Sequence, residues 1–281
     1  MNLLQYIKAN VENSDIRLTS HYIGNNRVNN SGDALEHFIK DGFSESLTIK
    51  NDQDRLIKYN EYFSYSGNKN NPPDLILENG DAVEIKKIEL KNSALALNSS
   101  YPKAKLFADS PMITQSCKEC EEWTVKDILY AIGHVTKNEL HTLWLIYGDC
   151  FAANKEVYEK IRDKISQGIK EIPNVEFTKT NELGKVKKVD PLGITDLRIR
   201  GMWHIENPHK IFNYLNAYDE KSKFQMICLL TKEKFDSFPA THKTYIKNLK
   251  ISGFLYKEVS IKNPNNPAKL IPSILITYKR D

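Results

Sequence analysis

The feature that most constrains this chain is an Asn79-Gly80 pair between two short apolar runs. Asn-Gly is a strong signal for a tight hairpin turn, because both residues accept positive φ angles. We therefore expect one strand over Asp74 to Leu77 and a returning strand over Ala82 to Ile88. The preceding Asn71-Pro72-Pro73 run supports this prediction, since it cannot continue a helix.

The predicted hairpin carries three ionisable groups. Side chains alternate between the faces of a strand, so Glu84 and Lys86 share one face of the returning strand, and Asp74 lies on its neighbour. Two carboxylates on adjacent strands suit Mg²⁺, which takes few protein ligands and keeps several waters. The Lys86 ammonium can orient or deprotonate an attacking water and stabilise developing negative charge. The three groups together predict phosphodiester hydrolysis.

A plainer interpretation of the same residues is open. Asp74 can be a turn acid, with Glu84 and Lys86 on an ordinary solvated face, because so short a pattern recurs by chance. The context favours the catalytic interpretation, since the pattern spans a turn and both acids fall in predicted strands. Glu36 precedes it on a predicted helix, beside an apolar stripe.

The rest of the chain mixes helical and strand patterns, which predicts an α/β fold with a mixed central sheet flanked by helices. Helices are expected over Asn2 to Glu12, from Ser31 as N-cap to about Gly42, over Trp123 to Val135, and over Lys155 to Ile169. Further strands are expected over Leu56 to Ser66, His141 to Cys150, Phe224 to Thr231, and Ile274 to Tyr278.

Composition and the absence of common sequence patterns exclude several classes of protein. No apolar run approaches the roughly 18 residues that span a bilayer, and no export signal is visible, so we expect a cytoplasmic protein without a membrane partner. Four cysteines are too few for a disulfide scaffold. The net charge of +4 is compatible with nucleic acid but does not demonstrate it. Glycine-rich phosphate loops and the GxSxG pattern of serine hydrolases are absent.

Cys117 and Cys120 form half of a possible zinc site. A structural zinc ion needs four ligands, and Cys150 and His134 are the conceivable partners. No second CxxC or paired histidine follows at the usual spacing, so free thiols are the favoured interpretation.

Three polar segments are candidates for DNA contact. A loop beyond the predicted catalytic strand offers amides, hydroxyls, an aromatic ring and amines. Arg198 and Arg200 fall on one face of a possible strand, where guanidinium groups suit guanine or phosphate. Lys185, Lys187 and Lys188 form a basic cluster nearby that could follow the DNA backbone. The alternatives are a solvent-exposed loop, surface ion pairs and a solvated basic cluster. The candidate residues are Asn98, Ser99, Ser100, Tyr101, Lys103, Lys105, Lys187, Arg198 and Arg200.

The pattern Pro73-Asp74, then Glu84-Ile85-Lys86, resembles the PD-(D/E)XK nuclease superfamily. The chain is more specifically similar to the NgoPII-type family of type II restriction endonucleases. The passages that carry this resemblance extend from about residue 70 to near the end of the sequence given, and they are NNPPDLILENGDAVEIKKIE, ALALNSSYPKAKL, CKECEEWT, LWLIYGDCFAANKE, VDPLGITDLRIRGMW and NPNNPAKLIP.

The resemblance implies a restriction-endonuclease-like core and a Mg²⁺-dependent homodimer. Such an enzyme cuts both strands of double-stranded DNA at a short palindrome, GGCC for this family, and leaves 5′-phosphate ends. Asp74 and Glu84 would be the metal ligands, Lys86 the catalytic lysine, and Glu36 the acid that many members carry on the preceding helix. A cognate DNA methyltransferase would accompany it.

The resemblance also implies one endonuclease domain over residues 1–281. Its catalytic core would lie at about 31–155, with recognition and peripheral elements at about 95–120 and 180–281. Two other functions stay open at this point. One is a repair or structure-selective nuclease of the same superfamily, and the other is a non-catalytic DNA-binding protein.

Overall fold

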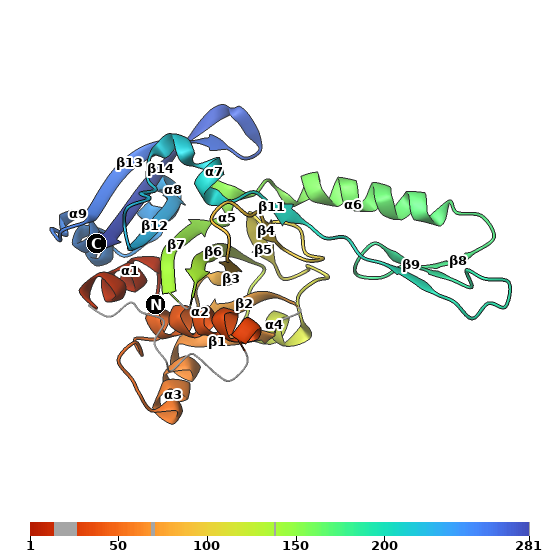
Figure 1. The fold of residues 1–281 in the computed structure, drawn as a ribbon, viewed down its shortest axis with the longest axis horizontal. Helices are drawn as coiled ribbons and strands as arrows, with labels where there is room; N and C mark the ends of the chain where they lie inside the picture. The colour runs from red at the N-terminus through yellow and green to blue at the C-terminus, as the bar shows by residue number, and fades with distance from the viewer. Residues whose placement is uncertain (14–26, 69–70, 138, 281) are drawn as a thin grey trace.

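A computed structural model describes residues 1–13, 27–68, 71–137 and 139–280 (Figure 1). Its body is built on a nine-stranded sheet in the order β1-β2-β3-β6-β7-β12-β14-β13, with β5 paired to β6. The β3–β6 and β7–β12 pairs are parallel and the others are antiparallel. The predicted α/β class with a mixed central sheet is therefore confirmed.

The strands of this sheet are β1 (Phe63–Asn68), β2 (Asn71–Leu77), β3 (Ala82–Ile88), β5 (Lys105–Phe107), β6 (Val125–Thr136), β7 (Glu139–Tyr147), β12 (Phe224–Thr231), β13 (Phe254–Asn263) and β14 (Asn266–Arg280). Because β12 to β14 extend the same sheet that holds the β2–β3 hairpin, the C-terminal part of the chain belongs to the body. The division of the chain into a core and peripheral elements stays a prediction.

Helices cover both faces of the sheet, so it has an apolar core on each side. On one face the core includes side chains of α1 (Leu3–Glu12), α2 (Arg27–Phe43), α8 (Lys232–Ser237) and α9 (Ala240–Asn248), with α3 (Asp52–Tyr62) at its margin. On the other face lie α4 (Gln115–Glu119), α5 (Gly148–Phe151), α7 (Pro208–Ile211) and the short 3₁₀ turn η2 (Asn213–Leu215). Among the described residues no helix is both long enough and apolar enough to cross a membrane.

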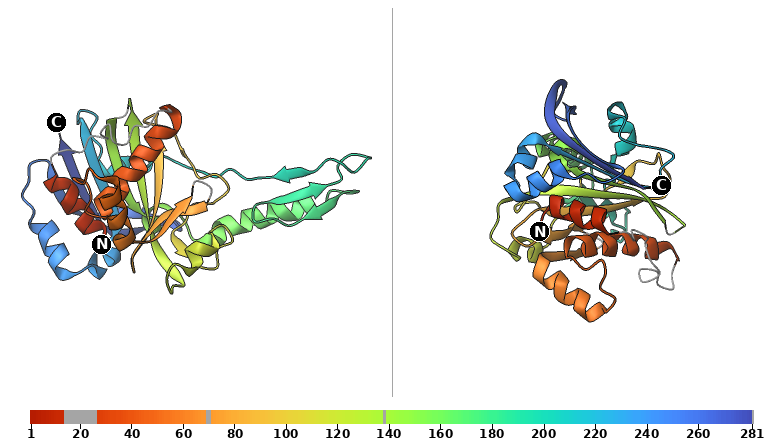
Figure 2. Two further views of the ribbon diagram at one scale, coloured as in Figure 1. Left: turned by 90° about the horizontal axis from the view of Figure 1, so that it is seen from below. Right: turned by 90° about the vertical axis from the view of Figure 1, so that its left-hand side faces the viewer.

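An arm projects from the body, as Figure 1 and the left view of Figure 2 show. It consists of α6 (Lys155–Lys170) and a small antiparallel sheet of β8 (Glu176–Thr178), β9 (Gly184–Lys187) and β10 (Leu197–Ile199). Its return strand β11 (His204–Ile205) pairs with β4 (Leu95–Ala96), which follows the β2–β3 hairpin. The arm is thus joined to the body beside that hairpin.

Several local predictions are confirmed. The β2–β3 hairpin turns at Asn79, whose φ of 50° is the left-handed conformation that the Asn-Gly pair indicates. The predicted helix over Lys155 to Ile169 is α6, and the strand over Phe224 to Thr231 is β12. The strand expected over Ile274 to Tyr278 lies within the longer β14.

The predicted helix over Trp123 to Val135 is wrong, because this segment forms β6. The strand lies in the middle of the sheet and is buried on both faces, with Leu129 and Ala131 in one core and Ile128, Tyr130 and Ile132 in the other. A strand covered on both sides loses its apolar–polar alternation. Its continuous apolar run cannot be distinguished from that of a buried helix by periodicity alone.

The predicted strand over Leu56 to Ser66 is also wrong in its first part. Helix α3 occupies Asp52–Tyr62, with Asn51 as its N-cap, and β1 begins only at Phe63. Leu56 and Ile57 are 58% and 57% exposed, so the apolar residues of this helix do not mark a buried face. Two boundaries also differ. Ser31 lies inside α2, which begins at Arg27, and β7 ends at Tyr147, before α5.

Candidate active site

The hairpin positions the two acids at the point where its strands separate. The β2–β3 ladder pairs Leu75 with Val83, and beyond that pair the backbone N–H of Ile85 donates to Oδ2 of Asp74 at 2.5 Å. Val83 and Ile85 point into the core that α2 covers. By strand alternation Glu84 therefore lies on the opposite face, where Asp74 meets β3.

The three predicted catalytic side chains converge on this face. Nζ of Lys86 lies 2.5 Å from Oε1 of Glu84 and 4.0 Å from Oδ2 of Asp74. Burial raises the pKa of Asp74 to about 7, and the nearby charge of Glu84 adds to the effect. Burial also opposes the charge of Lys86, but the neighbouring carboxylates outweigh it and raise the pKa of this lysine. The lysine therefore stays charged at neutral pH.

The donor set fits a divalent cation that takes few protein ligands. Oε2 of Glu84 is buried and accepts no hydrogen bond from any described residue. An unmet buried carboxylate oxygen is unfavourable, and a cation beside Asp74 and Glu84 would satisfy it. The described residues contain no group of three or more His, Cys, Asp or Glu side chains suited to a metal. Mg²⁺ is a cation that takes few protein carboxylates and keeps several waters.

The acids and Lys86 lie in a cleft of about 740 Å³ between the hairpin, the loop after β4 and the root of the arm. Among the predicted DNA-contacting residues, Asn98, Ser99, Ser100, Arg198 and Arg200 line this cleft. They come from segments about one hundred residues apart in the sequence. Backbone bonds join those segments, because Leu97 N–H donates to Trp203 O, and Trp203 N–H to Asn98 O, each at 2.8 Å.

The two arginines of the cleft share one buried carboxylate. Nε of Arg198 donates to Oε2 of Glu182 at 3.1 Å, and Nε of Arg200 donates to Oε1 at 2.8 Å. Arg198 lies in β10 and Arg200 just beyond its end, and both form the ion pairs that the alternative interpretation predicted. Their contact with DNA stays a prediction. Ser99 donates to Oε1 of the same glutamate at 2.9 Å, so the loop and the arm meet here.

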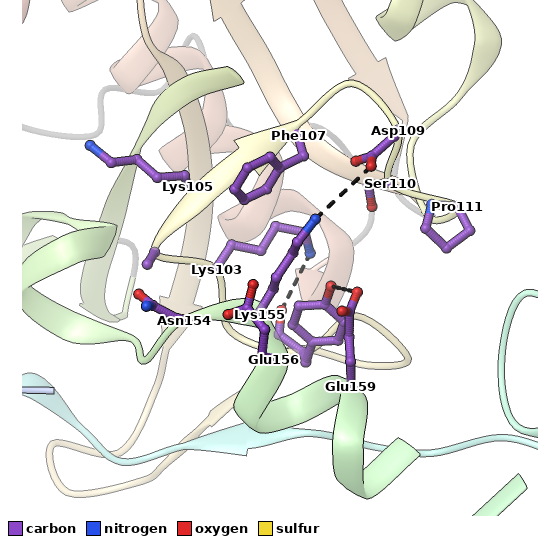
Figure 3. Close-up of a pocket in the computed structure, with 12 residues that line it drawn as sticks. Lys103, Lys105, Phe107, Asp109, Ser110, Pro111, Asn154, Lys155, Glu156 and Glu159 are labelled. Carbon is purple, nitrogen blue, oxygen red and sulfur yellow. Dashed lines mark hydrogen bonds and ion pairs between the residues drawn. The ribbon is translucent and has the colours of Figure 1, made fainter. Parts of the chain in front are cut away.

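Tyr101, Lys103 and Lys105 do not line this cleft, although Tyr101 and Lys103 border a small pocket beside it together with Glu84. They line a second pocket of about 250 Å³ at the base of α6, where Figure 3 shows Lys103 and Lys105 around Phe107 and Lys155. Lys105 forms an ion pair with Asp127. Lys103 is buried and donates to the hydroxyl of Ser100, and burial lowers its pKa to about 8.

Tyr101 is 9% exposed and packs into an aromatic cluster at the root of the arm. Its ring stacks on Tyr158 with centroids 5.4 Å apart and meets Trp203 edge-on at 6.2 Å, and its hydroxyl donates to Glu159 at 2.9 Å. Lys187 lies further out on the arm, on β9 opposite Glu176. The structure does not bring these two residues to the cleft, and their contact with DNA stays a prediction.

Glu36 lies on α2, which packs on the other face of the sheet. Its carboxylate accepts a hydrogen bond from Lys40 at 2.7 Å, and its side chain is 32% exposed. It does not line the cleft. Its charge still contributes to the raised pKa values of Asp74 and Lys86, so it acts on the site through the electrostatic field. A water-mediated metal contact for Glu36 stays a prediction.

All four cysteines are free thiols. Cys117 is buried in α4, and Sγ of Cys120 donates to the Cys117 carbonyl at 3.2 Å. Cys150 lies in α5 and His134 in β6, and within the described ranges no cluster of metal-binding side chains includes them.

Glu182, which organises one wall of the cleft, was not among the predicted site residues. It falls in a polar stretch and carries no recognisable pattern of its own. A usable signal was the Asp190-Pro191-Leu192-Gly193 turn, which predicts a hairpin between the flanking strands. In the structure β9 and β10 pair around it, with Arg198 opposite Lys185, and that register brings the arginines back toward Glu182.

The large mixed sheet flanked by helices, with Asp74, Glu84 and Lys86 together in one cleft, is consistent with a nuclease of the restriction-endonuclease-like class. The sequence model of the NgoPII restriction endonuclease family matches residues 1–262. A curated relative, the type II restriction enzyme NgoPII of Neisseria gonorrhoeae, is 45% identical over 279 residues, which cover 99% of each chain. No solved structure matches. The chain belongs to the NgoPII restriction endonuclease family.

Proposed function

We propose that this restriction endonuclease uses Mg²⁺ to cut both strands of DNA at a short palindrome. The observation that carries the proposal is the convergence of Asp74, Glu84 and Lys86 in one cleft with Arg198 and Arg200. The first three groups suit hydrolysis of a phosphodiester, and the arginines suit recognition of DNA. Family membership supports a DNA substrate.

Asp74 and Glu84 would hold the cation. When bound, Mg²⁺ would polarise the scissile phosphate and stabilise the charge that develops during hydrolysis. The Ile85 N–H fixes the Asp74 carboxylate, and the hairpin fixes Glu84 beside it. Lys86 stays protonated at neutral pH, which favours a role in orienting the attacking water and stabilising negative charge. The products would carry 5′-phosphate and 3′-hydroxyl ends.

We further propose that the DNA target is GGCC, as the family resemblance implies. Arg198 and Arg200 support this proposal, because arginine donates two hydrogen bonds to O6 and N7 of guanine. Asn98, Ser99 and Ser100 would add contacts to bases or phosphates from the facing wall of the cleft. The arm would then lie along the DNA beyond the target.

We propose that the enzyme acts as a homodimer through α6. The described part of the chain has one Asp74–Glu84 centre, whereas a cut through both strands of a palindrome needs two centres related by a twofold axis. Val157, Ile161 and Ile165 form an apolar stripe along α6 and are 53%, 52% and 45% exposed. Aliphatic side chains have no hydrogen-bond donors for DNA, so a second protein chain is the better partner.

A DNA methyltransferase of the same specificity would protect the host DNA, without any need for direct contact. The free thiols support a reducing compartment, the cytoplasm, as the place where the enzyme works.

Unmethylated plasmid tests these proposals directly. The purified protein is incubated with plasmid in Mg²⁺ or in EDTA, and the ends of the fragments are sequenced. We expect discrete fragments that end in one palindrome, only with Mg²⁺. Preferential cutting of nicked or branched duplexes would instead support a repair nuclease, and specific binding without any cutting would support a DNA-binding protein.

A further inference from the structure

Glu182 is a negatively charged residue in a cleft that is proposed to bind DNA, which is also negatively charged. It is an acid in the wall of a cleft that would bind a polyanion, yet its side chain is only 6% exposed. Each of its carboxylate oxygens accepts a hydrogen bond from one arginine Nε, and Oε1 also accepts one from Ser99. These three donors outweigh the effect of burial and hold the pKa of Glu182 below its usual value.

The bonds to Glu182 leave the terminal nitrogens of both guanidinium groups available for other contacts. A guanidinium group has five N–H donors, and Arg198 and Arg200 each use the Nε donor on Glu182. The side chains of both arginines remain 61% and 62% exposed in the cleft. The terminal nitrogens can therefore form the two-pronged contact that guanine O6 and N7 accept.

Burial excludes direct base contact by Glu182 itself. An acid can accept a hydrogen bond from cytosine N4, but both oxygens of this carboxylate are already occupied and covered. From its place between β8 and β9 it also contacts two other segments, the loop after β4 and the end of β10. A change at Glu182 therefore acts on DNA through the residues it holds.

We propose that Glu182 is a positioning residue for sequence specificity, which aims the guanidinium groups of Arg198 and Arg200 at the bases of the target and couples them to the Ser99 loop. The inference rests on the proposed function, since it assumes that the cleft binds a specific DNA site. An exposed arginine samples many rotamers, and two anchors on one rigid carboxylate remove most of that freedom before binding. Glu182 would thus favour binding to one base sequence over nonspecific binding to the phosphate backbone.

The test compares binding of two duplexes by wild type, Glu182→Gln and a control variant. One duplex contains the cleavage site found by end sequencing and the other has that site scrambled, and both are measured in Ca²⁺ at several salt concentrations. Glu176→Gln is the matched control, because it removes the same charge on the same arm from a residue that pairs with Lys188 outside the cleft.

We expect Glu182→Gln to lower the ratio of target affinity to scrambled-duplex affinity by about 10- to 100-fold. This is the discrimination that one or two bidentate contacts to bases provide. Its affinity for the scrambled duplex should stay equal or rise, since a negative charge is removed. Glu176→Gln should keep the wild-type preference. Arg198→Lys and Arg200→Lys keep the positive charge but lose the bidentate guanidinium donors. They should reproduce the loss of preference for the target duplex.

Three results would overturn the inference. If Glu182→Gln keeps the wild-type preference, or if both affinities fall in parallel with the melting temperature, Glu182 has a structural role only, and the proposed function stands. If the wild-type protein itself neither prefers nor cuts a discrete site, the proposed function fails and the inference fails with it.

Discussion

Nζ of Lys86 lies 2.5 Å from Oε1 of Glu84, and this pair closes one side of the candidate metal site. The other oxygen of Glu84 is buried without a partner among the described residues. The same glutamate is thus neutralised on one side and unsatisfied on the other. A cation would bind at the buried Oε2 of Glu84, and Lys86 would face the reacting phosphate from the side of Oε1.

Replacing Lys86 or Asp74 with alanine should remove cleavage and spare binding. Loss of one charged group at the reacting phosphate costs at least about 100-fold in rate. Target affinity should change little, because the arginine wall of the cleft is intact. Plasmid cleavage and a gel-shift assay measure the two effects. Lys87→Ala, which removes a lysine that pairs with Glu89 and does not line the cleft, is the control. Wild-type cutting by either active-site variant would refute the assignment.

Asp74→Asn should stabilise the metal-free protein at high pH. Folding raises the pKa of Asp74 from 3.8 to about 7, so the folded state binds this proton more tightly than the unfolded chain does. The free energy of unfolding therefore falls as the pH rises between those values. Asparagine has no such penalty and can still accept the Ile85 N–H.

The expected gain is about 1–3 kcal/mol at pH 8 and close to zero near pH 4. Urea unfolding in EDTA across this range measures it, with the exposed Asp109→Asn as control. An equal gain at both pH values would show that the effect does not arise from the charge of Asp74.

Ile161→Glu should disrupt the proposed dimer. A charge in the middle of the α6 stripe would be buried against the partner, which should weaken self-association by at least about 10-fold. Analytical ultracentrifugation measures this, and the ratio of double-strand cuts to nicks should fall with it. Gln167→Glu adds the same charge to another exposed face of the helix and should have no effect. A wild-type protein that is monomeric with and without DNA would contradict the dimer.

Tyr101→Ala should loosen the arm. The ring is buried between Tyr158 and Trp203, and removing a buried aromatic side chain costs about 3–5 kcal/mol. Tyr101→Phe removes only the bond to Glu159 and should cost about 1 kcal/mol. Urea unfolding and limited proteolysis at the arm measure both. A large loss of DNA affinity in Tyr101→Phe at unchanged stability would instead support direct contact of this tyrosine with DNA.

How much of the site was predictable depends on how local each contact is. Asp74, Glu84 and Lys86 lie on one hairpin, and the Asn79-Gly80 turn together with strand alternation was enough to bring them together. Helical periodicity also predicted α6 correctly, but it did not show that the apolar stripe of this helix is exposed on the surface. Periodicity failed for β6, because burial on both faces removed the alternation that distinguishes a strand.

The sequence by itself determined the β2–β3 hairpin that carries Asp74, Glu84 and Lys86, since turn geometry and the two-residue period of a strand act over a few neighbouring residues. Only the tertiary structure decided that Ser99, Glu182 and the two arginines form one unit. Their meeting depends on the β4–β11 pair and on the register of β9 with β10, which join segments far apart in the chain. Such pairings are set by the packing of the whole fold, and no local pattern encodes them.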